Sequence, residues 1–179
     1  MAWVASMDPQ KRTMTALMNA GADDGYTDLL NRAAVDVDTY ASPVPTALRT
    51  LQLVVSNDIA NDASMGRWAA TALHRGFKAL AVVPIASQGQ LPLALVLMAD
   101  EPMYFLQEES QLLTAIGGSL SAALDQLQKA QERHAREARL KLLETCVARV
   151  NDIVLITGVE SSDGLGPRIL YVNQAFERL

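Results

Sequence analysis

The acidic stretch NDIANDAS, residues 57–64, contains the side chains of this chain whose types and spacing could do chemistry. Asp58 and Asp62 lie four positions apart, and their carboxylates could bind a cation. The same residue types also favour tight turns and helix N-caps, because Asn, Asp and Ser side chains bond to nearby backbone groups. We therefore interpret the stretch as a capped turn and assign no metal to it.

Trp68 follows this turn, within a helix that we expect over residues 64–75. An indole offers an apolar face and one N–H donor, which suits the wall of a pocket for a small planar ligand. The alternative is that Trp68 is an ordinary core residue. Both interpretations place it on the inner side of the helix.

Side chains for nucleophilic or metal chemistry are scarce. The one cysteine, Cys146, can form no internal disulfide, and the two histidines, His74 and His134, fall on different predicted helices. The sequence contains no GxGxxG, GxxxxGK[ST], HExxH or CxxC motif. These absences predict a protein that is not an enzyme. The sequence does not indicate which cofactor, if any, the protein binds. A single cysteine also fits a reducing, cytoplasmic location.

Composition narrows the class of protein further. Of the 179 residues, 50% are hydrophobic and 20% are charged, which is typical of a globular chain. The net charge of −5 provides no basic surface for nucleic acid. The longest apolar stretches, 79–86 and 91–99, are separated by polar SQGQ, so they predict a hairpin and no membrane insertion.

Periodicity and turn signals predict an α+β fold, with helices flanking an antiparallel sheet. The expected order is strands over 2–7 and 13–20, helices over 26–34 and 46–50, a strand over 52–56, the helix over 64–75, the hairpin 79–87/91–99, and a helix over 105–150.

The long helix carries two apolar runs. The first alternates spacings of three and four, and the second resumes out of phase with it. A phase slip of this kind is typical of a two-stranded coiled coil with a stutter, which predicts a homodimer. Up to Leu127, a helix packed on its own domain explains the pattern equally well. The first run is Leu113, Ile116, Leu120, Ala123, Leu127 and Ala130, and the second is Leu140, Leu143, Val147 and Val150.

Two segments resemble a known family. PTALRTLQLVVSNDIANDASMGRWAATALHRGFKALAVVPI (45–85) and GQLPLALVLMADEPMYFLQEESQLLTAIGGSLSAAL (89–124) are similar to the middle and end of a GAF domain. The resemblance covers about residues 2–128 and implies a sensory domain over 1–128. The helix that usually opens the family is missing, so apolar surface is expected there unless a partner subunit covers it.

The resemblance also implies a ligand cavity between the sheet and its covering helices. The turn with Asp58 and Asp62, together with Trp68, would border it. Val82, Pro84 and Leu95 would face it from the strands. Some members of the family reduce free methionine sulfoxide through a nucleophilic and a resolving cysteine. Because Cys146 stands alone and outside the cavity, we expect no such activity here.

The last segment, NDIVLITGVESSDGLGPRILYVNQAFERL (151–179), resembles the start of a PAS domain. It contains two strands, DIVLIT and RILYVN, followed by the start of a helix. Asn173 would cap this helix, and Phe176 on it would face the interior of the domain. The segment is too short for a whole PAS domain, so we expect an incomplete one, joined to the GAF-like domain by a signalling helix over 129–150.

These patterns together predict a non-catalytic sensory module of a bacterial-type signal transduction protein. It would bind a small ligand in the GAF cavity and transmit the signal through a dimeric helix to the PAS domain and a downstream output domain. The alternative is a ligand-free GAF dimerisation scaffold.

Overall fold

The computed structural model describes residues 1–8, 10–149, 152–158, 168–173 and 175–176. The chain divides into two compact units, residues 1–126 and 127–179, and the long helix α4 (Gln107–Arg149) contributes to both. Each unit is described separately.

The first unit is built on a five-stranded sheet with the order β2-β1-β5-β4-β3, in which all neighbouring strands are antiparallel. The strands predicted from apolar alternation are confirmed, although the third is shorter than expected. β1 spans Ala2–Met7, β2 Met14–Ala20, β3 Val54–Ser56, β4 Ala79–Ile85 and β5 Leu93–Ala99.

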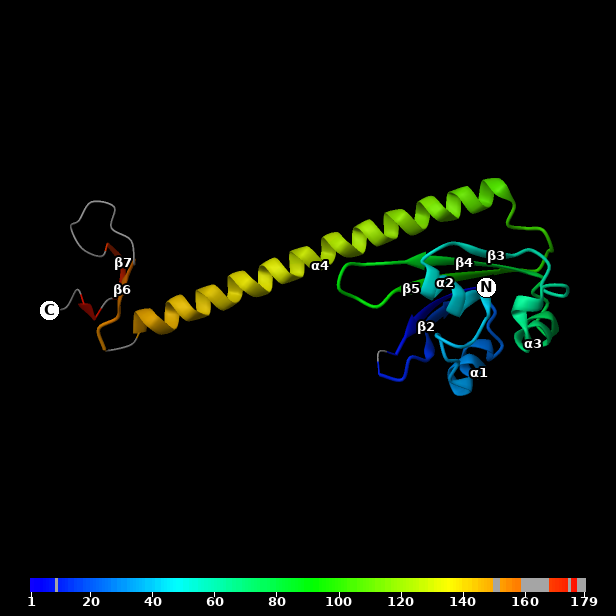
Figure 1. Cartoon of the computed structure of the whole chain (residues 1–179), viewed down its shortest axis with the longest axis horizontal. Helices are drawn as coiled ribbons and strands as arrows, with labels where there is room; N and C mark the ends of the chain where they lie inside the picture. Colours follow the sequence, from blue (N-terminus) through cyan, green and yellow to red (C-terminus); the bar gives the residue numbers. More distant parts are fainter. Residues whose placement is uncertain (9, 150–151, 159–167, 174, 177–179) are drawn as a thin grey trace. The chain divides into compact units, whose positions relative to one another are not determined.

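Helices cover both faces of this sheet, as Figure 1 shows, with α4 on one face and the short helices on the other. The short helices are α1 (Tyr26–Ala33), α2 (Pro43–Thr50) and α3 (Trp68–His74), and a 3₁₀ turn, Ala63–Met65, precedes α3. The α+β fold with a sheet flanked by helices is confirmed.

Two helix boundaries differ from the prediction. α2 begins at Pro43 rather than at residue 46, because a proline at the first helical position needs no N–H partner and already has a helical φ. The helix expected over 64–75 is two elements. Gly66, with φ 51° and ψ −134°, separates the 3₁₀ turn from α3, and that backbone conformation is open mainly to glycine.

Successive side chains of a strand point to opposite faces of the sheet, so each face has its own apolar core. Leu80, Val82 and Val96 pack with α1, α2 and α3 on one face. Ala81, Val83 and Phe105 pack with α4 on the other. The polar residues between these elements lie mostly outside both cores.

Residues of α4 in the first unit make two kinds of surface. Leu113 is buried against the sheet, and Gly117 lies over Val83 and Pro84. Ile116 and Leu120 are exposed, so only part of the predicted apolar run packs on its own domain. We call Ile116, Leu120 and Ala123, together with Leu127 at the start of the second unit, the α4 stripe.

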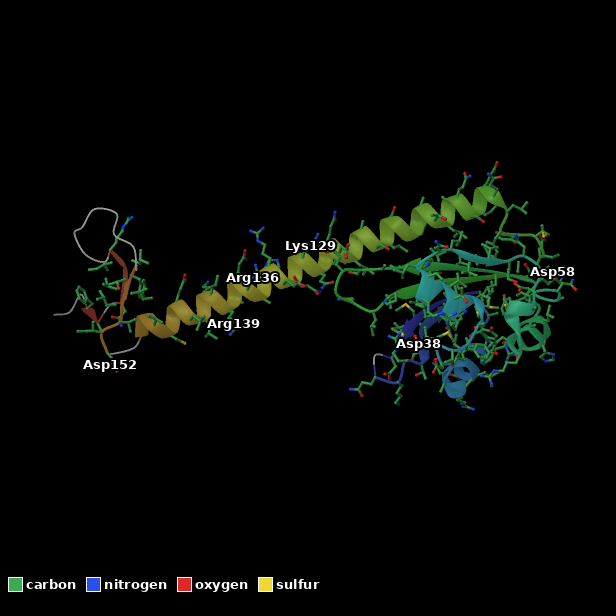
Figure 2. All side chains as sticks on the ribbon, viewed as in Figure 1. Asp38, Asp58, Lys129, Arg136, Arg139 and Asp152 are labelled. Carbon is green, nitrogen blue, oxygen red and sulfur yellow. The ribbon has the colours of Figure 1, made fainter. Side chains whose placement is uncertain are left out.

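The second unit contains the rest of α4 and an antiparallel pair of strands, β6 (Leu155–Thr157) and β7 (Ile169–Val172). Figure 2 shows Lys129, Arg136 and Arg139 extending from α4, where all three are exposed. The inward position expected for Phe176 is wrong: its side chain is 40% exposed, and no apolar layer from the described residues covers it. Most of the helix expected there lies outside the described residues.

Asn173 connects the parts of this second unit. It is 1% exposed, and its Nδ2 donates to the backbone oxygens of Asp152 (2.9 Å) and Val147 (3.3 Å). Its Oδ1 accepts from the N–H of Val154 at 2.9 Å. These bonds tie the strand pair to the end of α4, whereas the sequence had suggested only a helix cap for Asn173.

No helix among the described residues is both long enough and apolar enough to cross a membrane.

Candidate functional site

A small cavity lies between one face of the sheet and the helices α1, α2 and α3. Its volume is about 30 Å³, and every residue that lines it is uncharged. Both tryptophans of the chain are among them. The lining residues are Trp3, Met14, Tyr26, Leu30, Ser42, Pro43, Val44, Met65, Trp68 and Leu80.

The first residue of each short helix reaches this cavity. Tyr26 begins α1, Pro43 begins α2 and Trp68 begins α3. The floor comes from the middle of the sheet, where Trp3 on β1 pairs with Val96 on β5. Residues far apart in sequence are therefore brought together by the strand order, which places β1 next to β5.

Trp3 supplies a donor with no acceptor. Its side chain is 2% exposed, and no described residue accepts a hydrogen bond from its Nε1–H. Its ring meets that of Tyr26 edge-on, with the centroids 6.5 Å apart and the planes at 66°. A buried N–H without a partner is uncommon, so it requires an explanation at this position.

Tyr26 indicates how dry the wall of this cavity is. Burial raises the pKa of its hydroxyl to about 12, although the positive charge of Arg75 acts in the opposite direction. The hydroxyl therefore keeps its proton at physiological pH and can donate a hydrogen bond.

Arg67 is exposed and does not line the cavity, but it contacts one of the residues that do. Its guanidinium lies 5.0 Å from the ring centre of Trp68 and 5.4 Å from that of Tyr40, which are distances of cation–π contacts. The half-buried Trp68 is therefore held between the cavity and this arginine.

The six predicted site residues do not converge on one point. Trp68 lines the cavity, and Val82 is buried on the same face of the sheet. Leu95 pairs with Val83 and packs in the core on the α4 face, because one step along a strand reverses the side. Pro84 lines an open groove of about 370 Å³ between β4 and α4.

Asp58 and Asp62 do not line the cavity. Asp58, labelled in Figure 2, accepts a hydrogen bond from Asn61 at 2.7 Å. Asp62 caps the 3₁₀ turn by accepting from the N–H of Ser64 at 2.8 Å. Burial acts to raise the pKa of Asp62, but the nearby Ser56 hydroxyl and the hydrogen bond from Ser64 outweigh it and hold this pKa below its ordinary value. Both carboxylates thus serve the turn.

Sequence reasoning missed Trp3, Tyr26 and Ser42. A tryptophan in the alternating strand AWVASM was the available signal, because a large side chain at the centre of a strand must face one of the two cores. Among the described residues, no group of three or more His, Cys, Asp or Glu side chains could hold a metal ion.

The model of the GAF domain family matches residues 1–125 of this chain. The match covers well over half of the sequence, so the chain belongs to the GAF domain family. Among curated proteins, none matches the chain.

Two solved structures are similar in fold. One is the domain of a protein described as a two-component sensor histidine kinase from Sinorhizobium meliloti 1021, at 14% identity and TM-score 0.56, covering 74% of this chain and 83% of that one. The other is the photoproduct state of GAF3 from Slr1393 of Synechocystis sp. PCC6803, at 19% identity and TM-score 0.56, covering 73% of this chain and 85% of that one.

A third similar structure corrects one prediction. Free methionine-R-sulfoxide reductase from Neisseria meningitidis, solved in complex with its substrate, has 14% identity and TM-score 0.52, covering 72% of this chain and 70% of that one. An enzyme therefore shares this fold. The prediction that the chain is not an enzyme, which was drawn from missing catalytic motifs and a lone cysteine, is contradicted by this likeness.

Proposed function

We propose that this chain is a sensory and regulatory module of a bacterial-type signal transduction protein in the cytoplasm. Its GAF domain, residues 1–128, takes up a small molecule in the cavity lined by both tryptophans. The supporting observation is the buried Trp3 N–H, which has no acceptor among the described residues although Trp3 lines a largely apolar cavity. The similar sensor histidine kinase domain agrees with this role.

Of the six residues expected from the sequence, Trp68 is the strongest candidate for ligand contact, because it lines the cavity. Val82 supports the floor from the same face of the sheet. Asp58 and Asp62 shape the turn before α3 and so act on the ligand only through the position of Trp68. Leu95 acts on the α4 side of the sheet, and Pro84 lines the groove beside α4.

The signal travels through α4, which pairs with α4 of a second copy along the α4 stripe. Leu127 in that stripe is 61% exposed, so a large apolar side chain lies in water within a single chain and a partner helix could cover it. Ligand binding shifts the rotation or register of the paired helices at the stutter near Glu137, and the two states differ by a few kcal/mol.

The helix over 129–150 passes this shift to a PAS-type domain that begins near residue 151, and an output domain follows. The bonds from Asn173 to Val147 and Asp152 support this coupling, because they join the strand pair to the end of the helix. A shift in the rotation or register of the helix then moves the first strands of the second domain.

The alternative is a GAF dimerisation scaffold that binds nothing. The small cavity favours it, since about 30 Å³ accommodates only one or two waters. In this case the buried Trp3 N–H is satisfied by water, and the α4 stripe carries the whole function.

Native mass spectrometry of the protein as purified separates these two functions. A dimer with one small molecule bound per chain supports the sensor. A dimer of bare chains, together with no thermal shift from a metabolite panel, contradicts the sensor and favours the scaffold. A monomer at micromolar concentration contradicts the pairing of α4 in both.

A further inference from the structure

The chemistry of the cavity wall restricts what can bind there. Trp3 is the key residue, because an indole N–H donates and cannot accept. Tyr26 and Ser42 carry hydroxyls, which do either. The side chain that fixes the chemistry of a ligand is therefore the one that is buried and has no partner.

We infer that the cavity takes a small, uncharged, planar ring molecule whose hydrogen-bond acceptor receives the Trp3 N–H. This inference rests on the proposed sensory function and names the class of ligand for it. Three steps lead to it: the charge of the wall, its shape and its volume.

The wall disfavours a charged ligand. None of the lining side chains is ionisable to a charge at physiological pH, because the hydroxyl of Tyr26 stays protonated there. Arg67 and Arg75 contact the rings of Trp68 and Tyr26, but neither arginine lines the cavity. An ion that entered would lose its hydration without gaining an opposite charge.

The wall favours a flat ligand. The rings of Trp3, Tyr26 and Trp68 border the space, and aromatic faces stack on planar groups. Met14 and Met65 fill the remaining wall with flexible thioether chains, which adapt to an irregular outline.

The volume requires one part of the wall to move. A cavity of about 150 Å³ takes benzene in another protein, and this one has about 30 Å³. Trp68 is the movable part, because it is only partly buried at the edge of the core and its other described ring contact is with the exposed Arg67. A ring that enters must therefore disturb both indoles, at Trp3 by accepting a hydrogen bond and at Trp68 by displacement.

The test uses the full chain labelled with ¹⁵N-indole tryptophan. The chain has two tryptophans, and both line the cavity, so the two indole N–H resonances report on this site alone. The variant Trp68→Phe assigns them. Pyridine and benzene are the probes, because they have nearly the same size and shape and differ by one acceptor nitrogen. Benzoate tests a ring of similar shape that carries a negative charge.

We expect pyridine to move the Trp3 resonance downfield and to bind about tenfold more tightly than benzene, which is the gain of one hydrogen bond. Benzoate should bind more weakly than pyridine. In Trp3→Phe, which keeps a ring and loses the N–H, pyridine should lose its advantage and bind no more tightly than benzene, because its nitrogen gives up a hydrogen bond to water and gains none. If that variant does not fold, the comparison in the native chain decides by itself.

Equal binding of pyridine and benzene to the native chain overturns the inference and leaves the sensor proposal standing. Tighter binding of benzoate than of pyridine overturns the uncharged class. If none of the probes moves either indole resonance, the inference is also overturned. The native mass spectrum then decides separately whether the chain carries a ligand of another class.

Discussion

A β-carbon on Gly117 would lie 2.7 Å from the Cγ1 atom of Val83 and 3.1 Å from the carbonyl oxygen of Pro84. This distance fixes how closely α4 approaches β4. It also explains why a helix that extends over 43 residues tolerates glycine here, since any larger residue would separate the helix from the sheet.

Gly117→Ala should therefore destabilise the first unit by about 1–3 kcal/mol, as overpacking of a core does. Gly118→Ala is the matched control, because a β-carbon there meets nothing within 4 Å. The control should gain roughly 0.5–1 kcal/mol from helix propensity. Urea denaturation measures both. Equal effects of the two substitutions would show that the close approach of α4 to β4 does not exist in solution.

The free energy of unfolding should fall at alkaline pH because of the raised pKa of Tyr26. Its pKa is about 12 in the fold against an ordinary value of 10.0. The folded chain thus holds a proton that the unfolded chain has released, so this stabilisation is complete below pH 10 and is lost as the pH rises to about 12. The slope is about 1.4 kcal/mol per pH unit.

Tyr26→Phe should remove this part of the slope, because phenylalanine does not titrate. Urea denaturation of both proteins between pH 8 and 11.5 gives the comparison, and other titrating groups cancel in the difference. Parallel stability curves for the two proteins would show that Tyr26 is exposed to water in the native state.

Leu127→Glu should break the proposed dimer. Leu127 is exposed within one chain, so the charge costs the monomer little, but pairing along the α4 stripe would bury it. We expect dimer affinity to fall at least about tenfold by sedimentation equilibrium. Ala122→Glu places the same charge on an exposed part of α4 outside the stripe and should leave the affinity unchanged. Equal weakening by both variants would contradict the stripe as the seam.

Asn173→Ala should loosen the second unit. The substitution removes the acceptor for the N–H of Val154 and the donor to Asp152 and Val147. Hydrogen exchange at Val154 should speed up by a factor that corresponds to roughly 1–3 kcal/mol. Asn173→Asp keeps the acceptor but places a buried carboxylate against two carbonyl oxygens, so it should speed the exchange at least as much as Asn173→Ala. Unchanged exchange in both variants would contradict the role of Asn173 as the connecting residue.

Much of the fold could be predicted because local signals agree with it. Strand 79–85 alternates between two apolar cores, strand 2–7 buries every second residue in one of them, and α1 has its apolar residues on one side. The predicted start of α2 was wrong because prolines indicate loop as readily as the first turn of a helix. The break at Gly66 could not be predicted, since glycine is compatible with a helix unless its φ is known.

The candidate site was less accessible to prediction because it depends on pairing. The position of Trp3 beside the cavity follows from the contact of β1 with β5, which no local pattern contains. Leu95 was assigned to the cavity, but the register of the 79–99 hairpin puts Ala94 and Val96 on that face. A shift of one residue in the turn would have reversed this assignment.

The register of the sheet also places Asn19, Trp3, Val96, Val82 and Val54 in one row across all five strands. Their neighbours Ala81, Val83 and Leu95 belong to the opposite face. Substitutions in the row can therefore reshape the floor of the cavity without changing the residues of the sheet that pack against α4. If the chain works as proposed, ligand preference and helix output can diverge independently in evolution or in engineering, because alternate residues of the same strands face the cavity and α4.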